Sequence, residues 1–377
     1  MVKSDTKDWT WVLQRPCDEC GYDAAAVDLP DVGPGLRANA EAWLVVLGGP
    51  GARHRRAPEI WSVTEYAAHV RDVHEVFVQR LALMLEEDEP VFANWDQDAA
   101  ALEDRYDLLQ PDEVGPVLAE RAEAVAAAYD AVPRTSYERV GHRSNGSTFT
   151  TLTLARYHLH DVVHHLWDVR RELTVASYDA RATAYRDATT DAHERVSAAL
   201  GDFAACVGSG ARVLEIGSGG GRDALALEQH GVLVRRSDIT PGFVDLLRAA
   251  GHRADVLDPL VDDLADPESA DRPYDGVWAN ACLLHVARAD LPVVLARLAA
   301  VTRAGGVLRV SLKEGDGDGW ATHGSIGSPR MFTYWRLDEL TAVLDAAGWQ
   351  VEASSRDAGL RGETWLGVLA GRRVPAE

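Results

Sequence analysis

A glycine-rich run between Arg212 and Asp223, RVLEIGSGGGRD, has residue types and spacing suited to ligand binding. Apolar residues 213–216 predict a buried strand, and helix-forming residues resume at Asp223, so the glycines lie in a tight turn between strand and helix. Glycine adopts positive φ angles readily, and its missing side chain lets a ligand approach the backbone. The run therefore predicts a ligand-binding loop.

Histidines form a second group that could do chemistry, in the segment RYHLHDVVHHLWDV. His160 and His164 are four residues apart and share one helix face, so both can bind one metal ion while His69 approaches from a facing helix. Three neutral imidazoles leave coordination positions open, as a catalytic metal site requires. Asp161 and Asp168 could orient the rings as hydrogen-bond acceptors. The alternative is a helix that is polar on one side and aromatic on the other.

Two cysteines, Cys17 and Cys20, form a CxxC. A zinc ribbon needs a second ligand pair, and neither another CxxC nor a matching histidine pair is obvious. The pattern favours a reduced, structural pair over a metal or redox role.

Helices must position the histidines. Helical spacing is found in four segments of the N-terminal half, the second of them preceded by a Ser62–Glu65 capping box: residues 35–47, 63–86, 111–132 and 151–173. We expect residues 1–178 to form an all-α four-helix bundle. Residues 176–188 are small and polar, which is typical of a hinge.

Strands and helices alternate around the glycine run. Strands are predicted near 211–216, 232–238, 252–257, 274–281, 306–313, 349–356 and 363–371, and helices near 191–207, 223–230, 241–250, 288–303 and 336–347. This alternation predicts a second domain, residues 179–377, with an α/β doubly wound, Rossmann-like fold. Ligands of such folds bind at the carboxyl ends of the strands.

Two phosphate-binding interpretations of the loop fail. Arg222 occupies the last glycine position of a GxGxxG dinucleotide fingerprint, and the Lys and Ser/Thr of a P-loop are missing. Instead, Glu215 to Gly221 resembles motif I of class I S-adenosylmethionine-dependent methyltransferases, over about residues 190 to 377. Asp238, Asp255 and the run YDGVWANACLLHV extend the resemblance to later strand ends.

The resemblance implies S-adenosylmethionine as cofactor. Asp238 would accept hydrogen bonds from both ribose hydroxyls, because a carboxylate has acceptors only. Asp255 would contact the adenine amino group, although an acid after a short strand is also often a helix cap. The implied cofactor-binding residues are Glu215, Gly217, Ser218, Gly219, Gly221, Asp238, Ile239, Asp255, Val256 and Asn280.

The N-terminal half resembles the DinB-like superfamily, which includes mycothiol-dependent maleylpyruvate isomerases, over about residues 30 to 175. The matching residues are the run WSVTEYAAH ending at His69 and HDVVHH starting at His160. The resemblance implies that His69, His160 and His164 bind a divalent metal, with zinc, nickel and iron all compatible. Leu166 stands where thiohistidine synthases have Glu, so sulfoxide synthesis is not implied.

Composition narrows the partners. The 377 residues include 38 basic and 59 acidic ones, a formal charge of -21 that repels nucleic acid and anionic lipid. No stretch approaches the about 18 uninterrupted apolar residues of a membrane helix, and no signal peptide is recognisable, so we expect a cytoplasmic protein. The oligomeric state cannot be inferred from the sequence.

Together these features predict a methyltransferase for a small-molecule acceptor, with a metal-binding bundle that helps bind or present it. His285 is the first candidate for a general base, with loop packing as its alternative, and Asn280 for a positioning residue. The segment 313–335, rich in glycine and aromatic residues, could be a lid. The alternative function is a metal-dependent thiol transferase or isomerase centred on the bundle, with a regulatory S-adenosylmethionine domain.

Overall fold

The structure is a computed structural model that describes residues 8–55, 58–190, 194–269, 271–324 and 326–374. The chain forms two compact units, Met1–Leu173 and Thr174–Glu377. The division falls inside the long helix α5 (Thr151–Asp179), whereas the sequence analysis places the domain boundary after residue 178. Throughout the described ranges, every helix falls short of the length and apolarity that crossing a bilayer requires.

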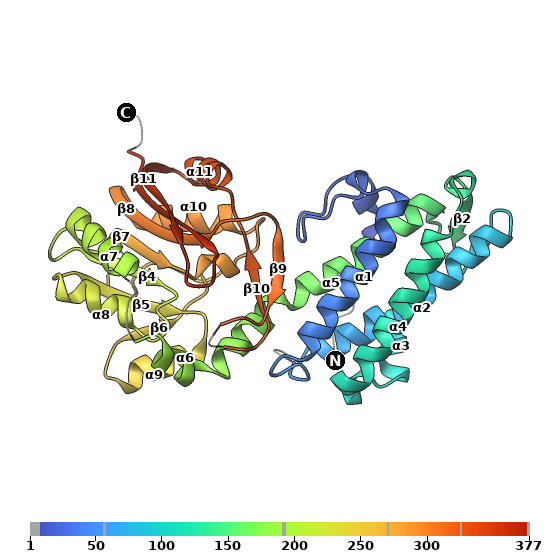
Figure 1. Ribbon diagram of the computed structural model, residues 1–377, viewed down its shortest axis with the longest axis horizontal. Helices are drawn as coiled ribbons and strands as arrows, with labels where there is room; N and C mark the ends of the chain where they lie inside the picture. Colours follow the sequence, from blue (N-terminus) through green and yellow to red (C-terminus); the bar gives the residue numbers. More distant parts are fainter. Residues whose placement is uncertain (1–7, 56–57, 191–193, 270, 325, 375–377) are drawn as a thin grey trace. The chain divides into compact units, whose positions relative to one another are not determined.

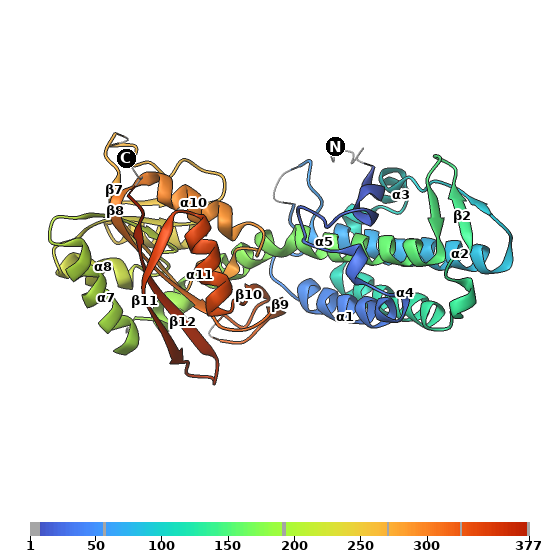
Figure 2. The same ribbon diagram turned by 90° about the horizontal axis from the view of Figure 1, so that it is seen from above.

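Four long helices build the first unit, and both views show them side by side (Figures 1 and 2): α1 (Leu29–Leu47), α2 (Val63–Glu86), α4 (Pro111–Asp130) and the first part of α5. Helix α4 packs against both α1 and α2. Large apolar side chains at helical spacing, such as Trp43 and Phe77, are buried in the core. The predicted all-α four-helix bundle is confirmed.

Local sequence sets the helix ends. The predicted capping box is present: Ser62 Oγ accepts a hydrogen bond from Glu65 N at 3.3 Å, and Glu65 Oε2 accepts one from Ser62 N at 2.8 Å. Helix α1 begins at Leu29 rather than Gly35, because Asp28 caps it and a proline fits its first turn.

Short elements connect the bundle helices. They are the 3-10 turns η1 (Trp9–Leu13), η2 (Ala24–Ala26), η3 (Tyr106–Leu108) and η4 (Arg134–Ser136), the helix α3 (Gln97–Glu103), and a small sheet of β1 (Val91–Phe92), β2 (Val140–Arg143) and β3 (Thr148–Thr150).

The second unit is built on a seven-stranded sheet with strand order β11-β12-β8-β7-β4-β5-β6. Its strands are β4 (Arg212–Ile216), β5 (Leu233–Asp238), β6 (Ala254–Val256), β7 (Tyr274–Asn280), β8 (Thr302–Lys313), β11 (Trp349–Ala358) and β12 (Thr364–Arg372). β12 is antiparallel to both of its neighbours, and the pairs from β8 to β6 are parallel. All seven predicted strands and the α/β doubly wound architecture are confirmed.

Helices cover both faces of this sheet: α7 (Glu194–Val207), α8 (Arg222–Gln229), α9 (Pro241–Ala249), α10 (Leu291–Val301) and α11 (Leu337–Ala346), with the turn η5 (Leu283–His285) after β7. Side chains alternate between two cores, as strand geometry requires. Leu214 and Val277 join the core under α10 and α11, while Val213 and Trp278 join the core under α7 and α8. The first residues of the predicted helix 191–207 lie outside the described residues.

Two connecting segments contain more regular structure than their sequences predict. Of residues 176–188, expected as a hinge, residues 176–179 end α5 and residues 182–188 form α6 (Ala182–Ala188), which leaves only 180 and 181 outside a helix. The segment 313–335 is not a plain loop, because β9 (Asp318–Ala321) and β10 (Arg330–Thr333) pair within it as an antiparallel ribbon.

Candidate functional site

The glycine turn after β4 has a conformation that only glycine adopts readily. Gly217, Gly219 and Gly221 have φ angles of +72°, +52° and +84°. A Cβ atom on Gly217 would lie 2.3 Å from Cys282 Cβ, and one on Gly221 would lie 2.5 Å from Leu247 Cδ2. The turn is therefore fixed by backbone geometry and by close packing.

Glu215 stabilises this turn from below. Ser218 Oγ donates a hydrogen bond to Glu215 Oε2 at 2.5 Å and accepts one from Ser237 N at 3.1 Å. Glu215 is 1% exposed, and burial raises the pKa of its carboxyl group to about 8. The side chain predicted to bind the cofactor is thus held inside the protein, neutral at neutral pH, and shapes the turn.

Asp238 lies beside the glycine turn at the carboxyl end of β5. Its Oδ2 accepts a hydrogen bond from Gly219 N at 2.9 Å, and its Oδ1 accepts one from Thr240 N at 2.8 Å. Burial raises the pKa of this carboxyl group, and the two backbone donors oppose that rise. The structure therefore joins the predicted acid to the predicted loop. Ile239, which follows, is half-buried.

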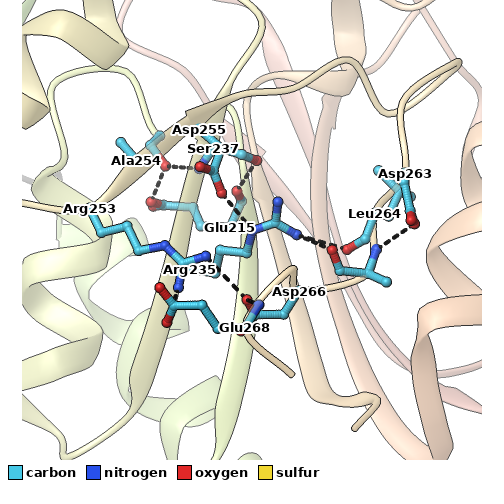
Figure 3. Close-up of polar contacts among 12 residues, drawn as sticks. Glu215, Arg235, Ser237, Arg253, Ala254, Asp255, Asp263, Leu264, Asp266 and Glu268 are labelled. Carbon is cyan, nitrogen blue, oxygen red and sulfur yellow. Dashed lines mark hydrogen bonds and ion pairs between the residues drawn. The ribbon is translucent and has the colours of Figure 1, made fainter. Parts of the chain in front are cut away.

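Asp255 forms an ion pair with Arg235 in the sheet (Figure 3). Its Oδ2 accepts a hydrogen bond from Arg235 Nε at 2.8 Å, while Arg235 Nη1 donates to the carbonyls of Leu264 and Ala265 at 3.0 and 2.9 Å. The acid thus helps to orient the arginine that fixes the connection before β7. Val256, the next predicted contact, is 48% exposed at the end of β6.

Asn280 ends β7 within a polar network. Its Nδ2 donates to Asp223 Oδ2 at 2.8 Å, and its Oδ1 accepts from Ser311 Oγ at 2.6 Å. Trp278 Nε1 donates to the same Asp223 oxygen at 3.1 Å. Asp223, at the start of α8, thereby links the strand end to the helix that follows the glycine turn.

His285 is hydrogen-bonded through both ring nitrogens. Nδ1 lies 2.6 Å from the Met331 carbonyl oxygen, so it bears the proton, and Nε2 lies 2.9 Å from Tyr178 Oη and accepts from it. Arg330 Nη1 donates to the same Tyr178 oxygen at 3.2 Å. Burial lowers the pKa of His285 to about 3, which makes the imidazole a weak base.

Sequence reasoning missed Tyr178, because it lies in the stretch interpreted as a hinge. Its ring belongs to an aromatic group with Tyr185 and Phe243, with ring centroids 5.4–6.0 Å apart. Helix α6 brings Tyr185 to the glycine turn: a Cβ on Gly219 would lie 3.7 Å from Tyr185 Cε1. The sequence signal that could have identified it is the pair of tyrosines seven residues apart in SYDARATAY, a spacing that would place both on one face of a continuous helix.

In the helical unit, the three predicted metal ligands separate into two groups. His69 lies with Asp161 and His165, and His160 and His164 lie with Cys17 and Cys20, the candidate ligand atoms within each group being no more than 4.8 Å apart. Asp161, predicted from the sequence only as an orienting acceptor, and His165, which was not predicted as a ligand, thus join His69 in place of His160 and His164.

The first group has the composition of an open metal site. Asp161 Oδ1 lies 3.7 Å from His69 Nε2 and 3.6 Å from His165 Nε2, too far for hydrogen bonds. Both ring nitrogens of His69 and Asp161 Oδ1 are buried without a hydrogen-bond partner in the described structure. Burial lowers the pKa of His69, and although burial opposes ionisation of Asp161, the two histidines hold its pKa below the ordinary value.

Asp168 orients His165, a ring outside the predicted ligand set, because its Oδ2 lies 3.0 Å from His165 Nδ1 and leaves Nε2 facing Asp161. The group borders a cavity of about 660 Å³ whose walls include Trp61, Tyr66 and Trp95. Two imidazoles and one carboxylate suit zinc and non-haem iron and leave positions for a ligand.

Comparisons with known proteins match each half separately. Residues 214–310 match the family model described as a methyltransferase domain, and residues 35–169 match the model of the DinB superfamily. Comparison with curated proteins gives no match.

Solved structures resemble about half of the chain. Burkholderia thailandensis 1,6-didemethyltoxoflavin-N1-methyltransferase is 25% identical, with 56% of this chain and 90% of that chain covered and a TM-score of 0.44. The magnesium protoporphyrin IX methyltransferase from Synechocystis is 16% identical, with 52% and 83% covered and a TM-score of 0.38. The CcbJ methyltransferase from Streptomyces caelestis is 19% identical, with 48% and 89% covered and a TM-score of 0.38.

Proposed function

We propose that this chain, which joins a DinB superfamily domain to a methyltransferase domain, transfers a methyl group from S-adenosylmethionine to a small-molecule acceptor. The helical unit would hold a divalent metal and help to bind or present that acceptor. When bound, S-adenosylmethionine supplies a methyl group on a sulfonium leaving group.

The observation that supports this proposal best is the pairing of Asp238 with the glycine turn. Each of its carboxylate oxygens accepts one backbone N–H, so lone pairs remain on both oxygens for a vicinal diol. Because β4 and β5 are adjacent parallel strands, the turn and the acid meet at the same carboxyl edge. The two hydroxyl groups of a ribose could donate hydrogen bonds to these two carboxylate oxygens.

The remaining residues of the edge hold its shape. Glu215 and Ser218 fix the turn from inside, and Asn280 is held by Asp223 and Ser311. Positioning of this kind matters because aligning two reactants can supply about 7–11 kcal/mol of barrier reduction.

If the acceptor must lose a proton, we expect Tyr178 rather than His285 to face it. Nε2 of His285 already accepts a hydrogen bond from Tyr178, so the imidazole orients the phenol and does not face an acceptor directly. Burial raises the pKa of Tyr178, and Arg330, whose Nη1 donates to the same oxygen, opposes that rise. We therefore regard His285 as a positioning residue for Tyr178.

A divalent metal fits His69, Asp161 and His165 best, because their candidate ligand atoms lie within 4.8 Å of one another, and those of His69 and Asp161 are buried without a hydrogen-bond partner in the described structure. It would supply a Lewis-acid position for a thiolate or an imidazole of the acceptor. Trp61 and Trp95, in the cavity wall, would exclude water around such a ligand.

A second candidate function follows from the same cavity. A thiol-dependent transferase or isomerase would need an open metal position beside a cavity large enough for a thiol cofactor, and the 660 Å³ space offers one. In that case the methyltransferase domain would be regulatory.

The two candidates are separated by a product search with S-adenosylmethionine labelled in its methyl group and a metabolite extract. The methyltransferase proposal predicts a labelled small molecule that disappears with Asp238→Asn and persists with Asp245→Asn, an exposed acid on α9. Thiol-dependent conversion of an extract component without label would favour the second candidate. Label that persists with Asp238→Asn would contradict the assigned cofactor site.

A further inference from the structure

We propose a second metal site in the helical unit, a closed zinc site formed by Cys17, Cys20, His160 and His164. One candidate ligand atom from each residue lies within 4.8 Å of the other three. Cys17 Sγ lies 3.7 Å from His164 Nδ1. The CxxC that lacked a partner in the sequence therefore meets a histidine pair 140 positions further along the chain.

A tight reversal presents the two thiols together. Cys17 N donates to the Tyr22 carbonyl at 2.8 Å, and Gly21 N donates to the Cys17 carbonyl at 3.0 Å. Gly21 has a φ of +74°, which a residue with a Cβ atom adopts only with strain. The other two ligands come from one face of α5, four residues apart, so both pairs are fixed by local backbone structure.

The group is buried and has unsatisfied ligand capacity. Cys17, His160 and His164 are 2%, 2% and 5% exposed, and none of the four cysteines forms a disulfide. Nε2 of His160 is buried without a hydrogen-bond partner in the described parts of the chain. A buried orphan nitrogen is costly, and coordination of a metal ion in this group would remove that cost.

The second nitrogen of His164 is placed as in many metal sites. Its Nε2 lies 3.6 Å from both Glu19 Oε2 and Asp168 Oδ1, on the side away from Cys17. A ligating histidine commonly donates its other N–H to a carboxylate, which fixes the tautomer. Here the carboxylates favour a protonated Nε2 and leave the Nδ1 lone pair for the metal.

The donor set identifies the ion. Two thiolates and two imidazoles select zinc, with bonds of about 2.3 and 2.0–2.1 Å, so tetrahedral ligand atoms lie about 3.3–3.8 Å apart. The sulfur–nitrogen distance of 3.7 Å falls in this range. Zinc binding releases the two thiol protons, and the resulting site is neutral. Four protein ligands leave no open position, so the role is structural.

Such a site would fasten the N-terminal segment to α5. That segment also supplies Trp9 and Glu19 to the wall of the cavity beside His69 and Asp161. Trp9 packs on His164 with ring centroids 4.6 Å apart. Zinc would thereby fix one wall of the cavity without touching its contents.

Cobalt substitution of the metal-free full chain tests this proposal. Tetrahedral thiolate ligation predicts an intense sulfur-to-cobalt charge-transfer band and protection of two thiols from a thiol reagent upon zinc binding. The band should be lost with Cys17→Ser and with His160→Ala, and retained with Cys206→Ser, an exposed cysteine, and with His69→Ala.

The wild-type spectrum alone can overturn the proposal, so it does not depend on the folding of any variant. Absence of the charge-transfer band, or mass mapping of a Cys17–Cys20 disulfide in the protein isolated without reductant, would show that the pair is not a zinc site. A band that persists in a folded Cys17→Ser variant would show that the thiolate bound to cobalt lies outside the proposed site.

Discussion

Glu215 and Asp238 are both buried carboxyl groups beside the glycine turn, yet their surroundings differ. Glu215 receives a hydroxyl hydrogen bond from Ser218, whereas Asp238 receives two backbone N–H bonds that favour its ionised form. We therefore expect Glu215 to act as a structural residue and propose Asp238 as the one that binds the cofactor. The sequence motif does not distinguish them, because each acid lies within the last two residues of its strand, at the carboxyl edge of the sheet.

Glu215→Gln is expected to change the pH dependence of stability. The folded pKa of about 8 exceeds the ordinary glutamate value of 4.5, so the stabilising contribution is complete below pH 4.5 and is lost as pH rises toward 8. Glutamine keeps a neutral group without this loss. Relative to the wild type, the variant should gain up to about 5 kcal/mol of unfolding free energy across this window, at about 1.4 kcal/mol per pKa unit.

Chemical denaturation at a series of pH values measures this difference, and Glu228→Gln on α8 is a control for an acid that is partly exposed. A difference between variant and wild type that stays constant from pH 4.5 to 8 would show that Glu215 is ionised in the fold.

His285 should not titrate between pH 5 and 8. Burial lowers its pKa to about 3, so the folded protein keeps the ring neutral, and stability from this group is present above pH 6.5 and lost as pH falls. The imidazole carbon-bound proton resonance, assigned by comparison with His285→Gln, is expected to be flat in that range. A midpoint near 6.5 would restore His285 as a conventional general base.

At the scale of elements, helical spacing alone does not determine which residues of α5 lie beside His69. His160 with His164 and Asp161 with His165 are both four residues apart, so each pair shares a helix face. Which pair meets His69 depends on the rotation of α5 against α2, and packing of the whole bundle sets that rotation. The spacing thus predicted a metal-binding helix, and the partners of each residue required the structure.

Metal content should follow His69, Asp161 and His165. In a Cys17→Ser/Cys20→Ser background, His165→Ala is expected to lose the remaining divalent ion and His160→Ala to keep it. Asp168→Asn should weaken affinity about 10–100-fold, because it orients His165. Elemental analysis after dialysis against defined metal concentrations checks this order. Loss of the ion in His160→Ala together with its retention in His165→Ala would instead support the ligand set predicted from the sequence.

The glycine turn should tolerate no side chain at Gly217. Alanine there combines a positive φ, which costs about 1–2 kcal/mol, with a contact 2.3 Å from Cys282 Cβ, and overpacking adds about 1–3 kcal/mol. Gly210→Ala is the matched control, since its φ is +79° and nothing lies within 4 Å of the added atom. Thermal unfolding of both should show the larger loss for Gly217→Ala. An equal decrease in melting temperature for both variants would show that the contact with Cys282 does not contribute to the destabilisation.

At the scale of the whole molecule, the chain consists of two units of different architecture, and their alternation patterns were readable in the sequence. Seven strands and all five sheet-covering helices match the predicted segments within a few residues, because hydrophobic period and glycine caps act locally. The ribbon β9–β10 and helix α6 were not predicted. Helix α6 has mostly small and polar residues, which give a weak periodic signal, and its Tyr185 contacts the distant residues Gly219 and Phe243. The two ribbon strands are only four residues each, which is too short for a clear alternation.

The end of α5 should fold as part of the second unit, Thr174–Glu377. Thr174 Oγ1 accepts from Met331 N at 3.0 Å, and Ser177 Oγ donates to the Pro329 carbonyl at 2.6 Å. A fragment of residues 174–377 is therefore expected to unfold at a higher temperature than residues 179–377, which lack these bonds and Tyr178. Calorimetric melting of the two fragments makes the comparison. Equal melting temperatures would favour the later boundary predicted from the sequence.

Isothermal titration of the full chain with S-adenosylmethionine tests the central claim most directly. The account predicts saturable one-site binding to the wild type, at least tenfold weaker binding to Asp238→Asn, and unchanged binding to Asp245→Asn and His69→Ala, with all variants folded. Absence of binding to the wild type, or unchanged affinity in Asp238→Asn, would contradict it.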